Sequence, residues 1–530
     1  MKRRDFLAGL GSSALALPLI LDGFTTQAFA DDSPSLKKVA ELASAQDRIL
    51  VLIQLSGGND GINTLIPLDQ LSTYYNIRRS VAIPENRITR LTSAIGLHPS
   101  FVAAKSLFDE GKLAIINGVS YPNVNQSHFR STDIWFTASD PEQYLSSGWL
   151  GRFVNYEAPT FPVGYPNDRT PDPLAIEIGG AMSLTLQGNT NAMGMTIRDL
   201  SAFEQLVNGQ NATGGSVAQR TGKAGNRLDF IRDVQAQSQK YSLRIKTIAE
   251  RGRNQAQYPD KGRNILADQL RIVARLISGG LQTRVYVVNL GGFDTHWSQT
   301  EVNDTTTGIH AGLLSNLAEG MRVFQQDLKL LGVENKVLGM TISEFGRRPA
   351  TTSNGTDHGT AGPVFLFGAP VRGGVIGINP SLTDLLPDGN LKMQYDFRQV
   401  YASVLSQWFQ ADATHLNTVL MKPFSTLNLL TTTSVREEQM LTATTQMTIS
   451  NYPNPCTDQT TIEYVLPRSS NVHLMLLDSR GHILTMIFSG FQPQGAQSIR
   501  VEAANLASGV YFYTLRTEYG MISGQMNVVR

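Results

Sequence analysis

The chain has 530 residues, which is long for one domain because domains usually contain about 100 to 200 residues. Hydrophobic residues make up 41% and charged residues 17%, a profile typical of a globular protein with a sizeable core. The 45 Lys and Arg residues nearly balance the 44 Asp and Glu residues, so no bulk charge indicates binding to nucleic acid. We therefore predict two folded units and no nucleic-acid partner.

The first thirty residues have the layout of a signal peptide. Residues 2–4 are basic, an apolar run extends from about Phe6 to Leu21, and Ala28-Phe29-Ala30 forms an A-x-A cleavage site. Glycines and serines interrupt the apolar run, which is too short and weak for a membrane span of about 20 apolar residues. The sequence therefore predicts export without a stable membrane anchor.

The basic start also indicates the export route. Arg3-Arg4 followed by Asp5-Phe6-Leu7 resembles the twin-arginine export motif. This resemblance implies that the twin-arginine translocase carries the folded chain, which suits a protein that must fold or acquire a metal before export. An ordinary Sec signal is the alternative.

Residues 31–430 alternate apolar runs with amphipathic stretches. The apolar runs at 49–55, 113–119, 174–178, 284–290 and 337–342 are predicted to be strands covered on both faces. Apolar spacings of three and four residues predict helices at 99–110, 219–251, 264–278, 309–331 and 397–409. These patterns predict an α/β domain with a largely parallel sheet and helices on both faces. Regions 155–172 and 208–224 are expected to be long surface loops that shape a binding mouth.

A polar, Thr-rich linker is predicted at 431–448, and a small β-sandwich at 449–530. Short runs rich in β-branched and aromatic residues at 460–466, 472–477, 498–502 and 510–517 are the predicted strands. Cys456 is the only cysteine, so no intramolecular disulfide can form, and we expect a free, exposed thiol.

Three motifs in this module carry a further resemblance. The segments Asn451-Tyr452-Pro453-Asn454-Pro455, Leu477-Asp478-x-x-Gly481 and Leu506-x-x-Gly509-Val510-Tyr511 resemble the C-terminal sorting domain of type IX secretion substrates. The resemblance implies a second export step, through the type IX secretion machinery, to the cell surface or the medium. An immunoglobulin-like carbohydrate-binding or adhesive domain is the alternative.

Five polar segments of the large domain are candidates for its chemistry. They lie at 56–61 (SGGNDG), 125–130 (NQSHFR), 291–296 (GGFDTH), 343–348 (SEFGRR) and 356–362 (TDHGTAG). Each one alone is more often structural than catalytic. Four of them follow separate predicted strands, so we expect them to converge on one edge of the sheet, where open α/β folds place their sites.

Carboxylate and imidazole side chains in these segments predict a metal site. The expected ligands are Asp60, Asp294, His296, Glu344 and His358, which supply enough oxygen and nitrogen atoms for one or two divalent ions, such as Zn, Mn or Ca. A buried polar network without metal is the alternative.

Three further residues are candidate catalytic groups. Ser127 is predicted to lie at a helix N-terminus, where free backbone N–H groups favour an incoming anion, although a simple N-cap is the commoner role. His128 is its neighbour, and Arg347 is expected to hold an anionic group. For His98 and His310 we expect structural roles, at a loop-to-helix junction and on a helix face.

The motifs LSGGNDGINTLIP, SHFRSTDIW, GGFDTH, SEFGR, DHGTAG and DFRQVY, in this order, resemble the exported bacterial family called domain of unknown function 1501. The resemblance covers about residues 45–430. That family is similar to the alkaline phosphatase and sulfatase superfamily, which implies a metal-dependent hydrolase fold with Ser127 as nucleophile. The sulfatase signature is not matched, because Ser120-Tyr121-Pro122-Asn123 is followed by Val124.

Two functions follow from the sequence. The first is an exported metal-dependent hydrolase of phosphate or sulfate esters on extracellular material, for example a polymer. The second is a relative without catalysis that serves in binding or in surface assembly.

Overall fold

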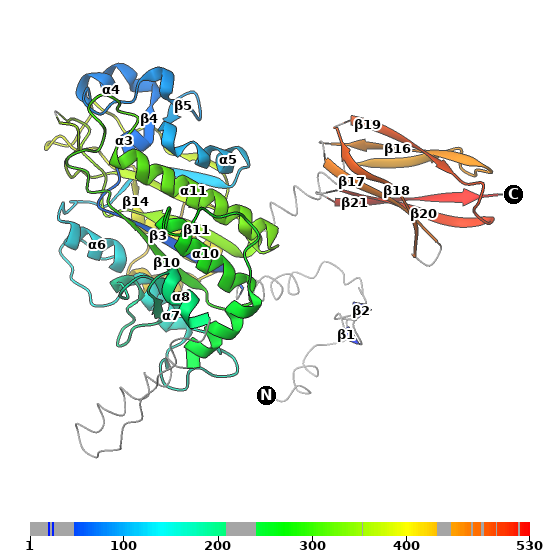
Figure 1. The fold of residues 1–530 in the computed structure, drawn as a ribbon, viewed down its shortest axis with the longest axis horizontal. Coiled ribbons are helices and arrows are strands. Elements are labelled where there is room, and N and C mark those ends of the chain that lie inside the picture. The colour runs from blue at the N-terminus through cyan, green and yellow to red at the C-terminus, as the bar shows by residue number, and fades with distance from the viewer. Residues whose placement is uncertain are drawn as a thin grey trace, which may run out of the picture. The chain divides into compact units, whose positions relative to one another are not determined.

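The computed structural model describes residues 20–21, 24–25, 47–207, 240–351, 353–431, 447–467, 470–478, 482–493, 495–517 and 520–529. The chain divides into two compact units, Met1–Leu430 and Thr431–Arg530 (Figure 1). The predicted signal peptide lies outside the described residues except for two short paired strands, β1 (Ile20–Leu21) and β2 (Phe24–Thr25). Most of the predicted linker and the predicted loop at 208–224 also lie outside them.

A nine-stranded sheet forms the centre of the first unit, in the order β13-β7-β12-β11-β3-β10-β8-β9, with β14 also paired to β7. Its strands are β3 (Ile49–Ser56), β7 (Leu113–Ser120), β8 (Ala175–Ile178), β9 (Met195–Ile197), β10 (Val285–Gly291), β11 (Val337–Ile342), β12 (Gly362–Phe367), β13 (Gly374–Ile376) and β14 (Tyr395–Asp396). Only β12 runs antiparallel to its neighbours, β11 and β7. The predicted, largely parallel sheet is confirmed, and β12 is an element that the sequence analysis did not anticipate.

The central strand β3 shows why these segments become strands buried on both faces. Val51 and Ile53 pack into one hydrophobic cluster, whereas Leu50 and Leu52 pack into another, and all four side chains are fully buried. Successive side chains of a strand point to opposite faces, so a continuous apolar run requires a cover on each face.

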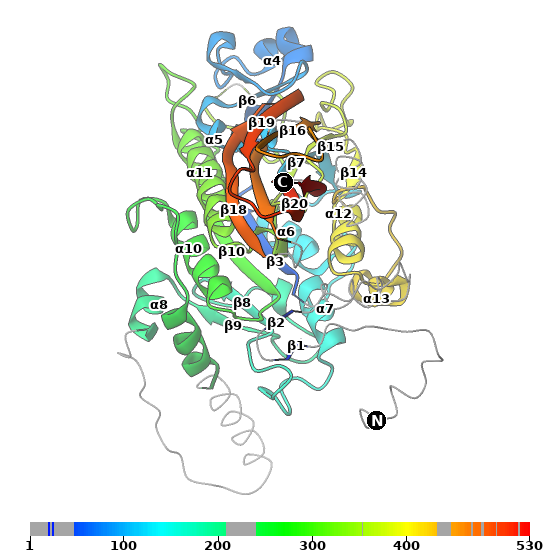
Figure 2. The same ribbon diagram turned by 90° about the vertical axis from the view of Figure 1, so that its right-hand side faces the viewer.

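Helices provide that cover. One cluster includes α5 (Ala103–Asp109), α8 (Leu200–Val207), α10 (Ile265–Ser278) and α11 (Ile309–Leu330). The other includes α6 (His128–Thr137), α7 (Trp149–Glu157), α12 (Phe397–Ser403) and α13 (Ala413–Leu420). Figure 2 shows the two groups on opposite sides of β3 and β10. The predicted α/β class with helices on both faces is thus confirmed.

Individual boundaries agree closely with the expected ones. The predicted helix at 99–110 consists of the 3-10 turn η3 (Pro99–Phe101) and α5, and α12 continues as the π-helical turn η6 (Val404–Trp408). Residues 240–251 are helical, and residues 158–172 contain no helix or strand. No helix among the described residues is long and apolar enough to cross a membrane.

Smaller elements surround the sheet. They are α3 (Gly61–Thr64), α4 (Leu71–Ile77), the 3-10 turns η1 (Leu68–Gln70), η2 (Glu85–Arg87), η4 (Leu184–Leu186) and η5 (Glu334–Lys336), and a three-stranded sheet of β4 (Leu65–Pro67), β6 (Ile95–Leu97) and β5 (Thr89–Arg90).

The second unit is the predicted β-sandwich. One antiparallel sheet contains β15 (Thr448–Tyr452), β16 (Gln459–Leu466) and β19 (Gly495–Glu502), and the other contains β18 (Ile483–Gln492), β17 (Ser470–Leu477), β20 (Gly509–Thr517) and β21 (Gly520–Val528). Residues of both sheets form one hydrophobic core. The Cys456 thiol is free as expected, but the expectation of exposure is wrong, because Cys456 lies in this core beside β21 and is 2% exposed.

Candidate metal centre

The polar loops meet at the carboxyl edge of the central sheet. Gly57, after β3, donates its backbone N–H to Glu344 Oε1, after β11, over 2.7 Å. Arg347 binds the carbonyl oxygens of Gly58 at 2.8 Å and of Phe293, after β10, at 3.1 Å. The loop before β12 reaches the same edge because β12 runs antiparallel. The predicted convergence is therefore confirmed.

Gly57 is required for this close approach. Its φ is 119°, in the region that favours glycine, and a Cβ atom there would lie 2.3 Å from the backbone nitrogen of Asp294. Any side chain at Gly57 would therefore separate the loops that follow β3 and β10.

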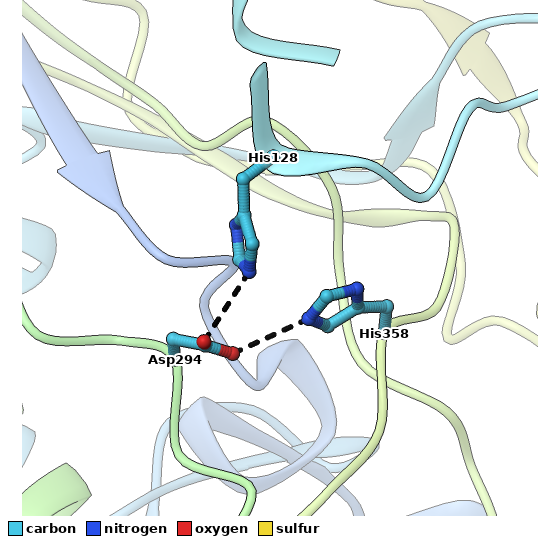
Figure 3. Close-up of side chains that lie close together, drawn as sticks. All are labelled: His128, Asp294 and His358. Atoms are coloured by element: carbon cyan, nitrogen blue, oxygen red, sulfur yellow. Dashed lines mark hydrogen bonds and ion pairs between the residues drawn. The ribbon is translucent and has the colours of Figure 1, made fainter. Parts of the chain in front are cut away.

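Three histidine rings surround the Asp294 carboxylate. Oδ1 lies 3.1 Å from His296 Nε2. Figure 3 shows the other two rings, with His358 Nε2 3.3 Å from Oδ1 and His128 Nε2 3.4 Å from Oδ2. One ligand atom from each of His128, Asp294 and His358 lies within 4.8 Å of the others. His296 adds a fourth group, since its Nε2 is 2.9 Å from that of His358. We call these four residues the His/Asp cluster.

The Nδ1 atom of each histidine faces an oxygen atom. His128 Nδ1 lies 2.8 Å from Glu344 Oε1, His358 Nδ1 lies 2.8 Å from the carbonyl oxygen of Gln126, and His296 Nδ1 lies 3.2 Å from Asp357 Oδ1. Each of these oxygens can accept a hydrogen bond from Nδ1, and the tautomer with hydrogen on Nδ1 leaves the Nε2 lone pair facing the cluster. Histidine ligands of metals are held in this way.

Charge at the cluster is balanced by one buried guanidinium. Burial alone would raise the pKa of Asp294, but the hydrogen bond and charge of Arg347, together with His128 and His296, lower it to about 2. Burial lowers the pKa of His358 and therefore favours its neutral form. An ionised carboxylate beside the neutral imidazole of His358 is a protonation state in which both groups can bind a metal ion.

Arg347 has a different position from the one expected for an anion-binding residue. Its side chain is fully buried, and its nitrogens donate to the carbonyl oxygens of Gly57, Gly58, Phe293 and Thr356 and to Asp294 Oδ1, the last at 2.7 Å. These contacts favour a positioning role, in which Arg347 joins three loops and holds Asp294.

Glu344 was expected to be a metal ligand, and its contacts favour a supporting position instead. Its side chain is only 4% exposed, and Oε1 accepts hydrogen bonds from Gly57 N and His128. Oε2 is buried without a hydrogen-bond partner among the described residues. The carboxylate therefore orients His128 toward the cluster and does not belong to the group of close ligand atoms.

Asp60 also lies apart from the cluster. Its buried carboxylate forms an ion pair with Arg78, accepts a hydrogen bond from Gln299 Nε2 at 2.6 Å, and caps α3 through Asn63 N at 3.4 Å. These contacts occupy both oxygens, so the structure does not bring Asp60 together with the other predicted ligands. Sequence reasoning missed Arg78, which no motif links to the GGNDG turn.

Ser127 occupies the N-cap position of α6 but does not cap the helix through its side chain. Ser127 is exposed, and its backbone N–H donates a hydrogen bond to Asn125 Oδ1 at 2.9 Å. A hydroxyl that is exposed beside His128 is compatible with the expected nucleophile and does not perform the alternative capping role.

The two histidines that were expected to be structural have structural contacts. His98 Nδ1 accepts a hydrogen bond from Ser100 N at 3.1 Å at the start of η3. His310, buried on α11, lies with Nε2 3.0 Å from Asn59 Oδ1.

A surface cavity of about 410 Å³, widely open to solvent, lies beside the His/Asp cluster. Its lining consists of Gln54, Ser56, Gly57, His128, Phe129, Thr132, Asp133, Asp294 and Glu344. Phe129, Thr132 and Asp133 belong to the motif SHFRSTDIW, but sequence reasoning gave them no role; their positions one, four and five residues after His128 on α6 could have indicated that they lie near it.

Comparisons with solved structures found distant likenesses. A protein of the alkaline phosphatase superfamily from Vibrio parahaemolyticus is 10% identical, with a TM-score of 0.33 over 84% of this chain and 81% of that one. The PsFucS1 sulfatase from Pseudoalteromonas sp. is also 10% identical, with a TM-score of 0.31 over 89% and 88%. With scores this low, no residue role is transferred from either protein. No curated protein matches the chain.

Two sequence families match the two units. Residues 450–528 match the secretion system C-terminal sorting domain, so the protein is exported to the cell surface or extracellular space, with the type IX secretion machinery as the implied partner. Both expectations are confirmed, and this match replaces the alternative of an adhesive domain. Residues 143–420, just over half of the chain, match the family described as protein of unknown function (DUF1501), and the chain therefore belongs to this family.

Proposed function

We propose that the protein is an exported, metal-dependent hydrolase of phosphate or sulfate esters on extracellular material. The observation that carries the proposal is the orientation of three histidines, each with Nδ1 facing an oxygen and Nε2 facing the Asp294 carboxylate. The Nε2 atoms of His296 and His358 are 2.9 Å apart, a distance at which a proton or a cation must lie between their lone pairs, and we assign a cation to the cluster.

We assign one divalent ion to His128, Asp294 and His358, whose ligand atoms lie within 4.8 Å of one another, with His296, which contacts His358 and Asp294, as a further donor. Three imidazole nitrogens and one carboxylate suit Zn²⁺ or Mn²⁺, whereas Ca²⁺ prefers six to eight oxygen ligands. A bound ion of this kind supplies Lewis-acid activation of an ester oxygen and of water. A second ion is disfavoured because Asp60, the other predicted carboxylate ligand, is paired with Arg78.

The chain's own residues have separate tasks in this proposal. Ser127 supplies an exposed hydroxyl at the N-terminus of α6, where backbone N–H groups attract an anionic ester. Glu344 holds the His128 ring, and Arg347 holds Asp294 in its ionised form. Export is proposed to begin with the twin-arginine translocase, which carries chains that have already folded around a metal.

A binding or assembly function without catalysis is the second candidate, and the position of Arg347 favours it. Its nitrogens are all directed to the protein's own oxygens, so this guanidinium does not hold the charge of a transferred group. A hydrolase of this kind would rely on the metal and the α6 N-terminus alone.

The test combines metal analysis with turnover of aryl phosphate, phosphodiester and sulfate esters by the full chain. We expect about one equivalent of Zn or Mn, lost in His296→Ala and kept in His482→Ala, a control histidine that is 75% exposed on the C-terminal unit. Ser127→Ala should retain the metal and lose turnover, whereas Ser201→Ala, an exposed serine on α8, should retain both. Absence of metal after reconstitution contradicts the proposal, and metal without turnover of any ester favours the binding function.

A further inference from the structure

We infer that the cavity beside the His/Asp cluster, which the exposed Phe129 lines, binds an uncharged sugar ring of a polysaccharide, and that the glycan extends over the cluster to the exposed Trp297 beside His296. The inference rests on the proposed function, because it takes this cavity as the place where the alcohol part of the ester lies. It names a substrate class, a largely neutral glycan.

The first observation is the exposure of two aromatic side chains. Phe129 directly follows His128 and is 88% exposed, and Trp297 directly follows His296 and is 76% exposed. The Phe129 side chain also lines the cavity, and the Trp297 ring lies 5.8 Å from that of His296. Single exposed hydrophobic residues are common on protein surfaces, but two aromatic side chains beside one cluster offer apolar surface that a ligand of the cluster can cover.

The backbone around Trp297 is held in place although its side chain is exposed. Ser298 has φ 53°, in the left-handed region, and its carbonyl oxygen accepts a hydrogen bond from Ile309 N at 3.3 Å. Thr295, on the other side, accepts one from Thr356 N at 3.0 Å. A ring on a fixed backbone loses little freedom when a ligand stacks on it, which favours affinity.

The lining of the cavity determines which ligand can enter. Gln54, Ser56 and Thr132 offer neutral hydrogen-bonding groups, Asp133, Glu344 and Asp294 offer carboxylates, and no Lys or Arg is among the described lining residues. The buried Oε2 atom of Glu344 has no hydrogen-bond partner among the described residues. Carboxylates that accept hydroxyl protons and aromatic rings that cover apolar C–H faces suit a sugar, whereas the same carboxylates repel a polyanion.

Asp133 fits the same occupant. Burial raises the pKa of its carboxyl, which Arg130 on the same helix opposes, so its protonated form is favoured more than in an ordinary aspartate. A carboxyl group in either protonation state can hydrogen-bond a sugar hydroxyl.

Tryptophan fluorescence provides a direct test of the binding. The chain has four tryptophans, and Trp135, Trp149 and Trp408 are at most 4% exposed, so quenching by iodide reports on Trp297. We expect at least one of three neutral polysaccharides, namely dextran, mannan and galactan, to protect the metal-loaded full chain from iodide. Dextran sulfate should not protect it.

Variants make the test specific. Phe129→Ala should weaken binding of the protecting polysaccharide about tenfold, and Tyr452→Ala, an 81% exposed aromatic on the C-terminal unit, should not change it. Trp297→Phe should remove the iodide-sensitive signal and identify its source. Protection by dextran sulfate alone, or by none of the neutral polysaccharides, overturns the inference. Ester turnover is scored separately, so loss of turnover with protection retained contradicts the hydrolase proposal and not the sugar site.

Discussion

The ring of His128 connects the buried carboxylate of Glu344, 2.8 Å from its Nδ1, to the carboxylate of Asp294, 3.4 Å from its Nε2. A histidine between two carboxylates has one nitrogen that donates and one that is free to bind, so Glu344 acts on the cluster through the ring.

We predict that Glu344→Gln weakens Zn²⁺ binding by about 10- to 100-fold, the usual effect of removing the carboxylate behind a histidine ligand. A competing chelator titrated against the purified protein measures the affinity. Glu301→Gln, at an exposed position, is the control. Equal affinities for the two variants would contradict the supporting role of Glu344.

Metal removal should destabilise the large unit. A ligand at 100 times its Kd stabilises the folded state by about 2.7 kcal/mol, and a chelator removes this contribution. We therefore expect a chelator to lower the Tm of the wild type and of His482→Ala but not of His358→Ala, which lacks one cluster nitrogen. An equal fall of Tm in all three proteins would place the metal elsewhere.

Much of the fold could be predicted from the sequence. The run ILVLIQL at 49–55 has no polar residue until Gln54, and a short apolar run of this length favours a strand buried on both faces. By contrast, β12 begins at Gly362, the last residue of a candidate motif, and nothing in its apolar residues distinguishes antiparallel from parallel pairing. Strand direction depends on the connections between distant strands, which local patterns do not encode.

The candidate site was predicted in part. Asp294 and His296 lie at one edge of the sheet because β10 ends just before them. His358 lies at the same edge because β12 begins just after it. The assignment of Asp60 and Arg347 could not be derived, because each depends on a partner distant in sequence, Arg78 for the first and the carbonyl oxygens of the neighbouring loops for the second. Buried charges are paired to offset the cost of burial, and the pairing is a property of the fold.

Arg347 should be essential for stability because its removal leaves several buried carbonyl oxygens without donors. Each unsatisfied buried group costs about 1 to 3 kcal/mol, so Arg347→Ala should lower the free energy of unfolding by on the order of 3 kcal/mol or more. Urea unfolding of the full chain measures this, with Arg90→Ala as the control, since the Arg90 side chain is 62% exposed. A loss no larger than that of the control would show that Arg347 is dispensable for holding the loops.

Two buried histidines predict a loss of stability in acid. Burial, with a contribution from His310, lowers the pKa of His98 to about 3, and burial lowers that of His310 to about 4. In the unfolded chain the pKa of each histidine returns to the ordinary value of about 6.5. At a pH between the folded and the unfolded pKa values, the unfolded state binds protons that the folded state does not. The two histidines therefore cost no stability above about pH 6.5, and the free energy of unfolding falls as the pH decreases toward about 4.

The His310 contribution can be isolated by His310→Gln, which keeps a donor for Asn59. Between about pH 4 and 6.5, the free energy of unfolding of His310→Gln should depend on pH less steeply than that of the wild type, by about 1.4 kcal/mol per pH unit. Urea unfolding at several pH values provides the measurement. Parallel curves for the two proteins would show that His310 does not stay neutral in the folded state.

Export provides the last prediction, which concerns residues 1–30. If the twin-arginine translocase recognises Arg3 and Arg4, replacing both with Lys keeps the charge of the basic start and should leave the precursor inside the cell, since an ordinary Sec signal needs only the charge. Cell fractionation with detection of the C-terminal sorting domain measures the location, and Lys2→Arg is the charge-matched control. Normal export of the double variant would assign the chain to the Sec route, and the metal would then have to be acquired after the chain leaves the cytoplasm, because Sec export precedes folding.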